Sequence, residues 1–253
     1  MLLVLDVGNT SISAGLFRGK RLAARGRIPT REPRAERYAR ALRGLLRDHG
    51  VPAGKVEAVI ISSVVPRATA ALKQALRGLV RPRPLVVGER IQAPVINRYR
   101  IPGQVGQDRL VNAAAALFLY GGPAIVVDFG TAVTLDLVNR RREYLGGLIV
   151  PGLEIALEAL ASRTALLPKI PLTPPKEFLG RDTQGSMRSG LFHGYGALCD
   201  GLVAAMKRRH APGAKVIATG GHAKMIAPFC RSIRIVNPDL TLQGLRLTYQ
   251  KSY

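Results

Sequence analysis

Tryptophan is absent from this 253-residue chain, and cysteine and aromatic residues are scarce. Aromatic residues make up 5% of the sequence against 47% for all hydrophobic residues, so the core has to be built from aliphatic and alanine side chains. The two cysteines, Cys199 and Cys230, form no Cys-x-x-Cys pair and have no neighbouring histidine pair, which argues against a zinc site and a disulfide framework. We expect both to be free thiols in a reducing compartment.

Three familiar motifs are also missing. The chain has no G-x-x-x-x-G-K-[ST] phosphate loop, no G-x-G-x-x-G after its first strand and no G-x-S-x-G elbow. A P-loop site is therefore excluded, and a dinucleotide-binding fold is disfavoured. No secretory signal is recognisable, because Asp6 interrupts the apolar start, so we expect a cytoplasmic protein without a membrane partner.

Acidic residues are few: 16 Asp and Glu stand against 38 Lys and Arg, which gives a formal net charge of +22. Much of the excess lies in residues 18–47, where basic residues recur every few positions. A field of this sign attracts ATP, acidic metabolites, nucleic acid or anionic lipid, although a solvated arginine-rich surface explains the same pattern. Because few aromatic residues interleave, base stacking is not indicated, and we expect nucleic-acid binding to be nonspecific at most.

Two segments of the chain are nearly alike. Residues 3–10 read LVLDVGNT and residues 125–132 read IVVDFGTA, so each is an aliphatic run ending in Asp-x-Gly and small residues. Such a run predicts a buried strand, and the glycine lets an anion approach backbone N–H groups. The aspartate at the strand's end can hold a hydrated divalent cation. The pair predicts a duplicated α/β unit with a phosphate-binding turn in each half, and a nucleotide polyphosphate held between the halves as the natural ligand.

Strand-like and helix-like segments alternate along the chain, which indicates the α/β class. The patterns predict strands at 2–7, 11–17, 22–29, 56–61, 85–87 and 215–218, with a second strand–turn–strand at 124–138. They predict helices at 33–48, 66–79, from 107, 152–163 and 185–209. Residues 91–106 and 168–181 are expected to be loops, and the C-terminus to supply little chemistry.

Other candidate motifs are weaker on their own. Gly106-Gln107-Asp108-Arg109 stands where a loop becomes a helix, and a kinase needs a carboxylate for the hydroxyl proton and a guanidinium for an anionic acceptor. The same residues could instead be an acidic first helical turn beside a surface arginine. Gly220-Gly221 fits either a nucleoside contact or an ordinary turn, and Asp182-Thr183 either a site or a helix N-cap. Asp136 could be structural.

Taken together, these motifs resemble the type III pantothenate kinases, members of the acetate kinase, sugar kinase, heat-shock chaperone and actin superfamily. The resemblance runs from Leu3 to about Gly221 and rests on Asp6 to Thr10, Gly106 to Arg109, Asp128 to Ala132, Tyr144 to Gly147, Pro151 to Ile155, Gly180 to Gly194 and Ala218 to Gly221. It implies two actin-like (ribonuclease H-like) α/β domains, residues 1–115 and 116–253, with mixed sheets flanked by helices. Gln107 departs from the family, which usually has a small residue there.

The resemblance also implies an activity and its residues. It implies that ATP phosphorylates pantothenate, the first step of coenzyme A synthesis, in a homodimer, with Mg²⁺ and a monovalent cation (K⁺ or NH₄⁺). Asp108 would be the general base, Asp6 would hold Mg²⁺ through the phosphates and Asp128 the monovalent cation. The implied ATP contacts are Asp6, Val7, Gly8, Asn9, Thr10, Ser11, Ile12, Ser13 and Thr131. The implied pantothenate contacts are Tyr99, Gly106, Gln107, Asp108, Arg109 and, from the partner subunit, the residue at the position of Thr183.

Two other functions remain open at this point. A non-catalytic regulator of the same fold would bind nucleic acid or protein through the basic face, but Asp6, Asp108 and Asp128 are intact. Another phosphotransferase of the superfamily would act on a different small acid.

Overall fold

The computed structural model describes residues 1–252 and divides the chain into two compact units. The first unit comprises residues 1–115 together with the C-terminal residues from Leu240 onward, and the second comprises Ala116–Asp239. The sequence places the C-terminal residues in the second domain instead. They join the first unit because the last helix packs on three strands of its sheet.

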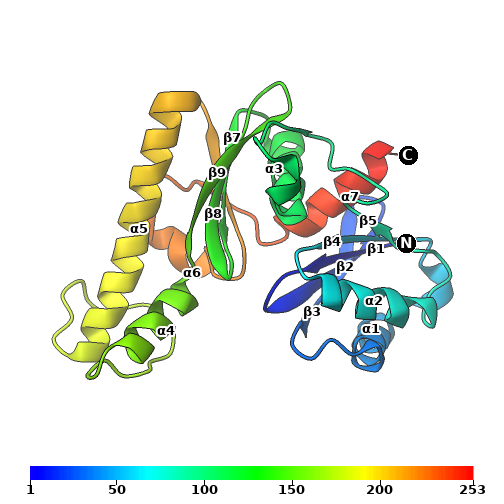
Figure 1. The fold of residues 1–253 in the computed structure, drawn as a ribbon, viewed down its shortest axis with the longest axis horizontal. Coiled ribbons are helices and arrows are strands. Elements are labelled where there is room, and N and C mark those ends of the chain that lie inside the picture. The colour runs from blue at the N-terminus through cyan, green and yellow to red at the C-terminus, as the bar shows by residue number, and fades with distance from the viewer. Residues whose placement is uncertain (253) are drawn as a thin grey trace. The chain divides into compact units, whose positions relative to one another are not determined.

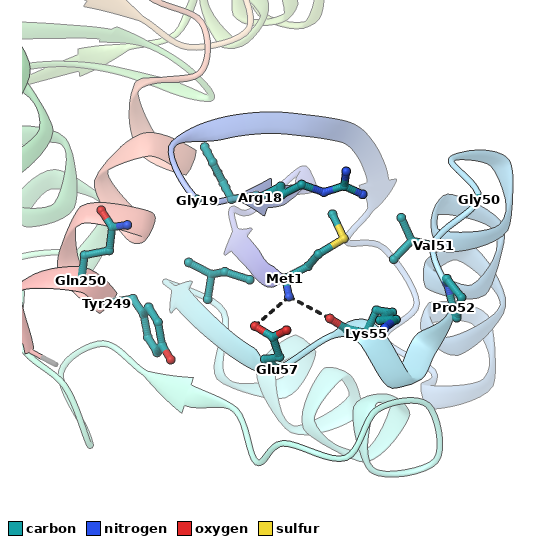
Figure 2. A pocket seen from close by; sticks show the side chains of 12 residues that line it. Met1, Arg18, Gly19, Gly50, Val51, Pro52, Lys55, Glu57, Tyr249 and Gln250 are labelled. Carbon is teal, nitrogen blue, oxygen red and sulfur yellow. Dashed lines mark hydrogen bonds and ion pairs between the residues drawn. The ribbon is translucent and has the colours of Figure 1, made fainter.

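The first unit is built on a mixed sheet of strand order β3-β2-β1-β4-β5. Its elements are β1 (Leu2–Val7), β2 (Ser11–Arg18), β3 (Arg21–Pro29), α1 (Ala35–Asp48), η1 (Ala53–Lys55), β4 (Ala58–Ser63), α2 (Pro66–Arg77), β5 (Leu85–Val86), β6 (Ile96–Asn97), η2 (Pro102–Gln104), the start of α3 (Gln107–Tyr120), and α7 (Leu240–Ser252). The strands β1, β2 and β3 are antiparallel neighbours, whereas β4 runs parallel to β1. Helices α1 and α2 cover one face of this sheet and α7 the other (Figure 1).

Helix α1 shows how a strongly basic segment still folds onto a core. Tyr38, Ala39, Leu42 and Leu46 are buried on one side of the helix, while its arginines face solvent. Each fully buried side chain of Leu size contributes about 1.5–3 kcal/mol of transfer free energy. The Tyr38 hydroxyl donates a hydrogen bond of 2.9 Å to the carbonyl of Thr30, so the buried polar group is satisfied.

The second unit repeats this plan. Its elements are β7 (Ala124–Phe129), β8 (Ala132–Val138), β9 (Glu143–Pro151), α4 (Leu153–Arg163), α5 (Thr183–His210), β10 (Lys215–Thr219), α6 (Ala223–Ile226), η3 (Ala227–Phe229) and β11 (Ile235–Val236). Its strands lie in the order β11-β10-β7-β8-β9, with β7 antiparallel to β8 and parallel to β10. Because strand order and directions match those of the first unit, the predicted duplication and the α/β fold class are confirmed.

Helix α7 is the main element that the sequence reading missed. Gly244, in the second turn of this helix, allows close packing: a Cβ on Gly244 would lie 2.5 Å from the carbonyl oxygen of Val111 in α3. The helix therefore depends on a tertiary contact rather than on local propensity.

Candidate active site

The first predicted phosphate turn joins β1 to β2. Asp6 lies opposite Ser13 near the end of the hairpin, and the Gly8 N–H donates a hydrogen bond of 3.1 Å to the Ser11 carbonyl. Thr30, at the end of β3, holds the turn, because its hydroxyl donates a hydrogen bond of 2.7 Å to the Gly8 carbonyl. Its N–H donates to the carbonyl of Thr10 at 3.1 Å.

The side chains of this turn divide into buried and exposed sets. Val7 and Ile12 are fully buried in the core, so only their backbone groups can meet a ligand. Asn9 and Thr10 are exposed, and Ser13 is half-buried. The turn therefore offers backbone donors and short polar side chains to solvent, which is the chemistry that suits phosphate oxygens.

The Gly106–Arg109 motif begins α3. The Asp108 carboxylate accepts a hydrogen bond of 2.9 Å from the N–H of Arg109, whose N–H also donates to the Gly106 carbonyl at 3.1 Å. The carboxylate lies over Gly106, and a Cβ on that residue would collide with Oδ1 of Asp108. Arg109 is only 7% exposed, so the alternative of a surface arginine is wrong. The glycine is needed because it leaves room for the carboxylate of Asp108.

Val64 connects this motif to the phosphate turn. Its N–H donates a hydrogen bond of 3.1 Å to the carbonyl of Val7, the last residue of β1. Its Cγ1 would lie 3.3 Å from a Cβ on Gly106. One residue thus touches both the end of β1 and the glycine before Asp108, so the candidate base stands beside the candidate phosphate turn within a single unit.

The side chain of Gln107, which departs from the family pattern, lies against Gly88. A Cβ on Gly88 would lie 2.9 Å from both Cδ and Nε2 of Gln107, and Gly88 has a φ of +90°. The glycine therefore makes room for the longer side chain. Tyr99 is half-buried in the loop after β6, where its N–H donates a hydrogen bond of 3.0 Å to Oδ1 of Asn97.

Two glycines pack against the second predicted turn, which lies in the second unit. Asp128 lies opposite Thr134, and the Gly130 N–H donates a hydrogen bond of 3.1 Å to the Ala132 carbonyl. Gly220, with a φ of +93°, lies against Asp128: a Cβ there would overlap Oδ1 of Asp128. Gly152, the N-cap of α4, backs onto the Gly130 carbonyl, which a Cβ would approach to 2.7 Å.

Two further predicted residues have local structural roles. The Asp182 side chain is the N-cap of α5 and accepts a hydrogen bond of 2.7 Å from the Gly185 N–H, and Thr183 is exposed on the first turn. Asp136 is completely buried and accepts hydrogen bonds from the Tyr144 hydroxyl at 2.7 Å and the Thr134 hydroxyl at 2.8 Å. Asp136 is thus structural, as the sequence suggested.

The structure adds residues that sequence reasoning did not single out: Thr30, Val64 and Gly88. Each acts through a contact with a residue distant in sequence, and none belongs to a motif of its own. Gly88 stands between Val87 and Glu89, and this context does not identify Gln107 as its partner.

Comparison with known proteins finds a matching family. Residues 2–205 match the family model described as type III pantothenate kinase. The chain is 42% identical over 253 residues to the type III pantothenate kinase of Halalkalibacterium halodurans, covering 100% of both chains. It is 44% identical to that of Geobacter sulfurreducens, covering 100% of this chain and 99% of the relative. Component A of (R)-2-hydroxyglutaryl-CoA dehydratase from Acidaminococcus fermentans shares the fold, with a TM-score of 0.61 at 14% identity over 99% and 98% of the two chains.

Proposed function

This chain belongs to the type III pantothenate kinase family, and from that premise we propose which of its residues carry the reaction. The activity is the transfer of a phosphoryl group from ATP to pantothenate, which gives 4'-phosphopantothenate for coenzyme A synthesis. The observation that supports the residue assignment most directly is the position of Val64. It touches the end of β1 and Gly106, which puts a carboxylate next to a phosphate turn.

Asp108 is the proposed general base. It accepts the proton of the pantothenate hydroxyl as that oxygen attacks the γ-phosphorus atom, and the bond to the leaving ADP oxygen breaks. The hydrogen bond from the Arg109 N–H fixes the orientation of the carboxylate before substrate arrives. The guanidinium of Arg109, in its buried position, pairs with the pantothenate carboxylate and orients the hydroxyl.

The turn of residues 6–13 is the proposed phosphate site, with Thr131 as a further ATP contact. Its backbone N–H groups and the side chains of Asn9 and Thr10 donate to phosphate oxygens. Asp6, half-buried at the end of β1, supplies the hard oxygen ligand that Mg²⁺ prefers. When bound, Mg²⁺ neutralises phosphate charge and helps to align the groups.

Asp128 fits a monovalent cation. The absence of a side chain on Gly220 leaves room for the Asp128 carboxylate, and the carbonyl of Phe129 lies close to the same glycine. Carboxylate and carbonyl oxygens together are suitable ligands for K⁺ or NH₄⁺.

A homodimer is the proposed assembly, with Tyr99, Gly106, Gln107 and, from the partner copy, the Thr183 position completing the pantothenate site. Large apolar side chains are exposed in the second unit: Ile149, Leu166, Phe178 and Leu179 are 61%, 89%, 69% and 74% exposed. An exposed set of this kind marks a protein contact. Light scattering at micromolar concentration tests this proposal, with twice the 27.2 kDa chain mass expected.

Cytoplasmic location is part of the same proposal, because the substrates are small soluble metabolites. Across residues 1–252, no helix combines the length and the apolar character that crossing a membrane requires. The alternative of a non-catalytic regulator is not favoured, since the relatives matched over their whole length carry the kinase name.

The test measures ADP release with and without pantothenate. Asp108→Asn should lower pantothenate-dependent turnover by about 10²–10⁴-fold, the range for a positioned acid–base group, while calorimetry finds ATP binding unchanged. Asp48→Asn, at an exposed carboxylate of α1, is the matched control and should keep full activity. Near-normal turnover of the Asp108 variant would remove the base assignment. ADP release that does not depend on pantothenate in the unmodified protein would overturn the activity itself.

A further inference from the structure

The two cysteines lie far apart in sequence but side by side in the second unit. Cys199 is in α5 and Cys230 directly follows η3. The backbones of these elements touch one helical turn earlier, at Gly196, where a Cβ would lie 2.9 Å from the carbonyl carbon of Phe229. Because Cys199 follows Gly196 by three residues and Cys230 follows Phe229 by one, this close approach brings the two sulfurs together.

A second contact joins α5 to the segment after η3, next to the same two cysteines. The carboxylate of Asp200 accepts hydrogen bonds from the N–H groups of Arg231 at 2.9 Å and Ser232 at 2.8 Å. Desolvation is the largest influence on the pKa of Asp200 and raises it, but hydrogen bonds from Ser232 and Arg231 outweigh it and hold that pKa below its usual value. The carboxylate therefore stays ionised near neutral pH, and this contact persists. The two cysteines thus lie beside two contacts between α5 and the segment after η3, one between backbones at Gly196 and one through the Asp200 carboxylate.

The Cys230 thiol donates a hydrogen bond of 3.6 Å to the carbonyl of Ile226. The neighbouring Cys230 thiol lowers the pKa of Cys199, and this effect outweighs the opposing effect of burial. The proximity of Cys199, together with burial, raises the pKa of Cys230. Cys199 is thus the better nucleophile and Cys230 the proton-bearing neighbour. Both are buried, at 1% and 6% exposure, so large reagents are kept away.

A pocket of about 640 Å³ opens next to this pair. Asp200, Arg231 and Ser232 line it, and these residues adjoin Cys199 and Cys230 in sequence. The aromatic rings of Phe178 and Phe229 form another part of its wall, each packed edge-on against His193. This pocket is large enough for a small neutral oxidant and is lined by the sequence neighbours Asp200 and Arg231 of the two cysteines.

From this geometry we propose that Cys199 and Cys230 form a reversible intrachain disulfide when the protein meets hydrogen peroxide. The Cys199 thiolate attacks one peroxide oxygen and is oxidised to a sulfenic acid, while the O–O bond breaks and, after protonation, water leaves. The Cys230 sulfur then attacks the Cys199 sulfur, the S–O bond breaks, and a second water leaves with the Cys230 proton. Two electrons pass from the two sulfurs to the peroxide. The disulfide would close a loop of residues 199–230, which contains Gly220, the glycine that lies against Asp128.

The experiment treats the reduced full-length protein with hydrogen peroxide, denatures it and alkylates the remaining thiols. We expect two alkylated cysteines before treatment and none after it, and an intact mass lower by two hydrogen atoms. A non-reducing peptide map should contain one linked pair with Cys199 and Cys230, and dithiothreitol should restore both thiols. Glutathione in the same buffer is the positive control for the oxidant.

Single serine variants separate the two roles. Cys230→Ser should form no intrachain link and should trap the Cys199 sulfenic acid, which dimedone labels. Cys199→Ser should form no link and take little dimedone. If both thiols of the unmodified protein stay alkylatable while glutathione is fully oxidised, the proposal is wrong. Cross-links that join two chains, or dimedone on Cys230 rather than Cys199, would also contradict it.

Discussion

The turn after β1 and the turn after β7 begin with the same Asp-x-Gly pattern but close at different lengths. The last paired residues are Val7 and Ile12 in the first unit, and Phe129 and Val133 in the second. The first turn is therefore one residue longer. The extra residue leaves Asn9 and Thr10 exposed as a polar loop, whereas the shorter turn keeps Thr131 as its one exposed polar tip. The longer turn of the first unit therefore exposes more polar side chains, which fits the proposed phosphate site.

The strand beside each turn, β4 or β10, also ends in a different residue in the two units. Ser63 lies opposite Val7 in the parallel pair β1–β4. In the parallel pair β7–β10, Asp128 lies opposite Thr219, and Gly220 is the next residue. The Ser63 hydroxyl accepts hydrogen bonds from the Val65 N–H at 3.0 Å and the Thr69 hydroxyl at 2.5 Å, which stabilises the start of α2. Gly220 has no side chain, and the Asp128 carboxylate occupies that space. One unit uses the position to hold a helix and the other to hold a carboxylate.

Gly220→Ala should have the largest effect. The new Cβ would meet the Asp128 carboxylate and lie 2.6 Å from the Phe129 backbone, and a φ of +93° strains any L side chain. Overpacking and backbone strain together should cost about 2–5 kcal/mol of unfolding free energy, measured by urea denaturation. The K⁺ dependence of activity should disappear as well. Ser63→Ala, at the corresponding place, should cost about 1 kcal/mol and leave K⁺ dependence intact. Equal costs would mean that the two positions are not specialised.

Gly8→Val tests the first turn. Its Cβ would lie 3.3 Å from the Ser11 carbonyl oxygen, a contact that the turn can absorb, so the fold should survive. The side chain would still occupy space that phosphate oxygens need, and ATP affinity should fall about 10–100-fold, or about 1.4–2.8 kcal/mol. Calorimetry measures this directly. Unchanged affinity would remove the phosphate role from the longer turn, and with it the interpretation of the extra residue.

Asp136→Asn probes a difference in the interior of the two sheets. Asp136 occupies the place opposite Val126 where the first unit has Gly15 opposite Val4. Replacing the carboxylate weakens the hydrogen bonds from Tyr144 and Thr134 and should cost about 1–3 kcal/mol of unfolding free energy, without changing KM for ATP. Thr134→Val removes one donor and should cost less. A change in KM with unaltered stability would point to a role in the site instead.

The smallest effect concerns charge. The first unit holds more than half of the 38 Lys and Arg but fewer than half of the 16 Asp and Glu. We expect duplex DNA to bind weakly and only at low salt, with log affinity falling linearly with log salt concentration. Fluorescence anisotropy with several sequences measures this. Replacing Arg40, Arg43 and Arg47 by Glu should abolish the binding and leave kinase turnover within about twofold. Sequence-selective binding at physiological salt would instead revive the regulator hypothesis.

Local patterns in the sequence were sufficient to predict most strands, most helices, the duplication and the motifs. The short strands β6, inside the expected loop of residues 91–106, and β11 were missed. An aliphatic run ending in Asp-x-Gly predicts a buried strand and a turn wherever it occurs, because burial and the glycine's conformational freedom are local properties. Asp108 at the start of a helix and Asp182 as an N-cap were also readable, since capping depends on a few adjacent residues. The activity could be predicted from the resemblance because the motifs of that family occur in the same order along this chain.

Contacts between distant residues could not be predicted this way. Gly220 could not be matched to Asp128, Gly88 to Gln107, or Val64 to Gly106, because a glycine's sequence context does not say which side chain fills its space. Helix α7 joined the first unit against the order of the chain because burying Leu242 and Leu245 on that sheet outweighs a glycine within the helix. The same is true of the cysteines: composition indicated two separate thiols, and only the packing of α5 against η3 decided that they are neighbours.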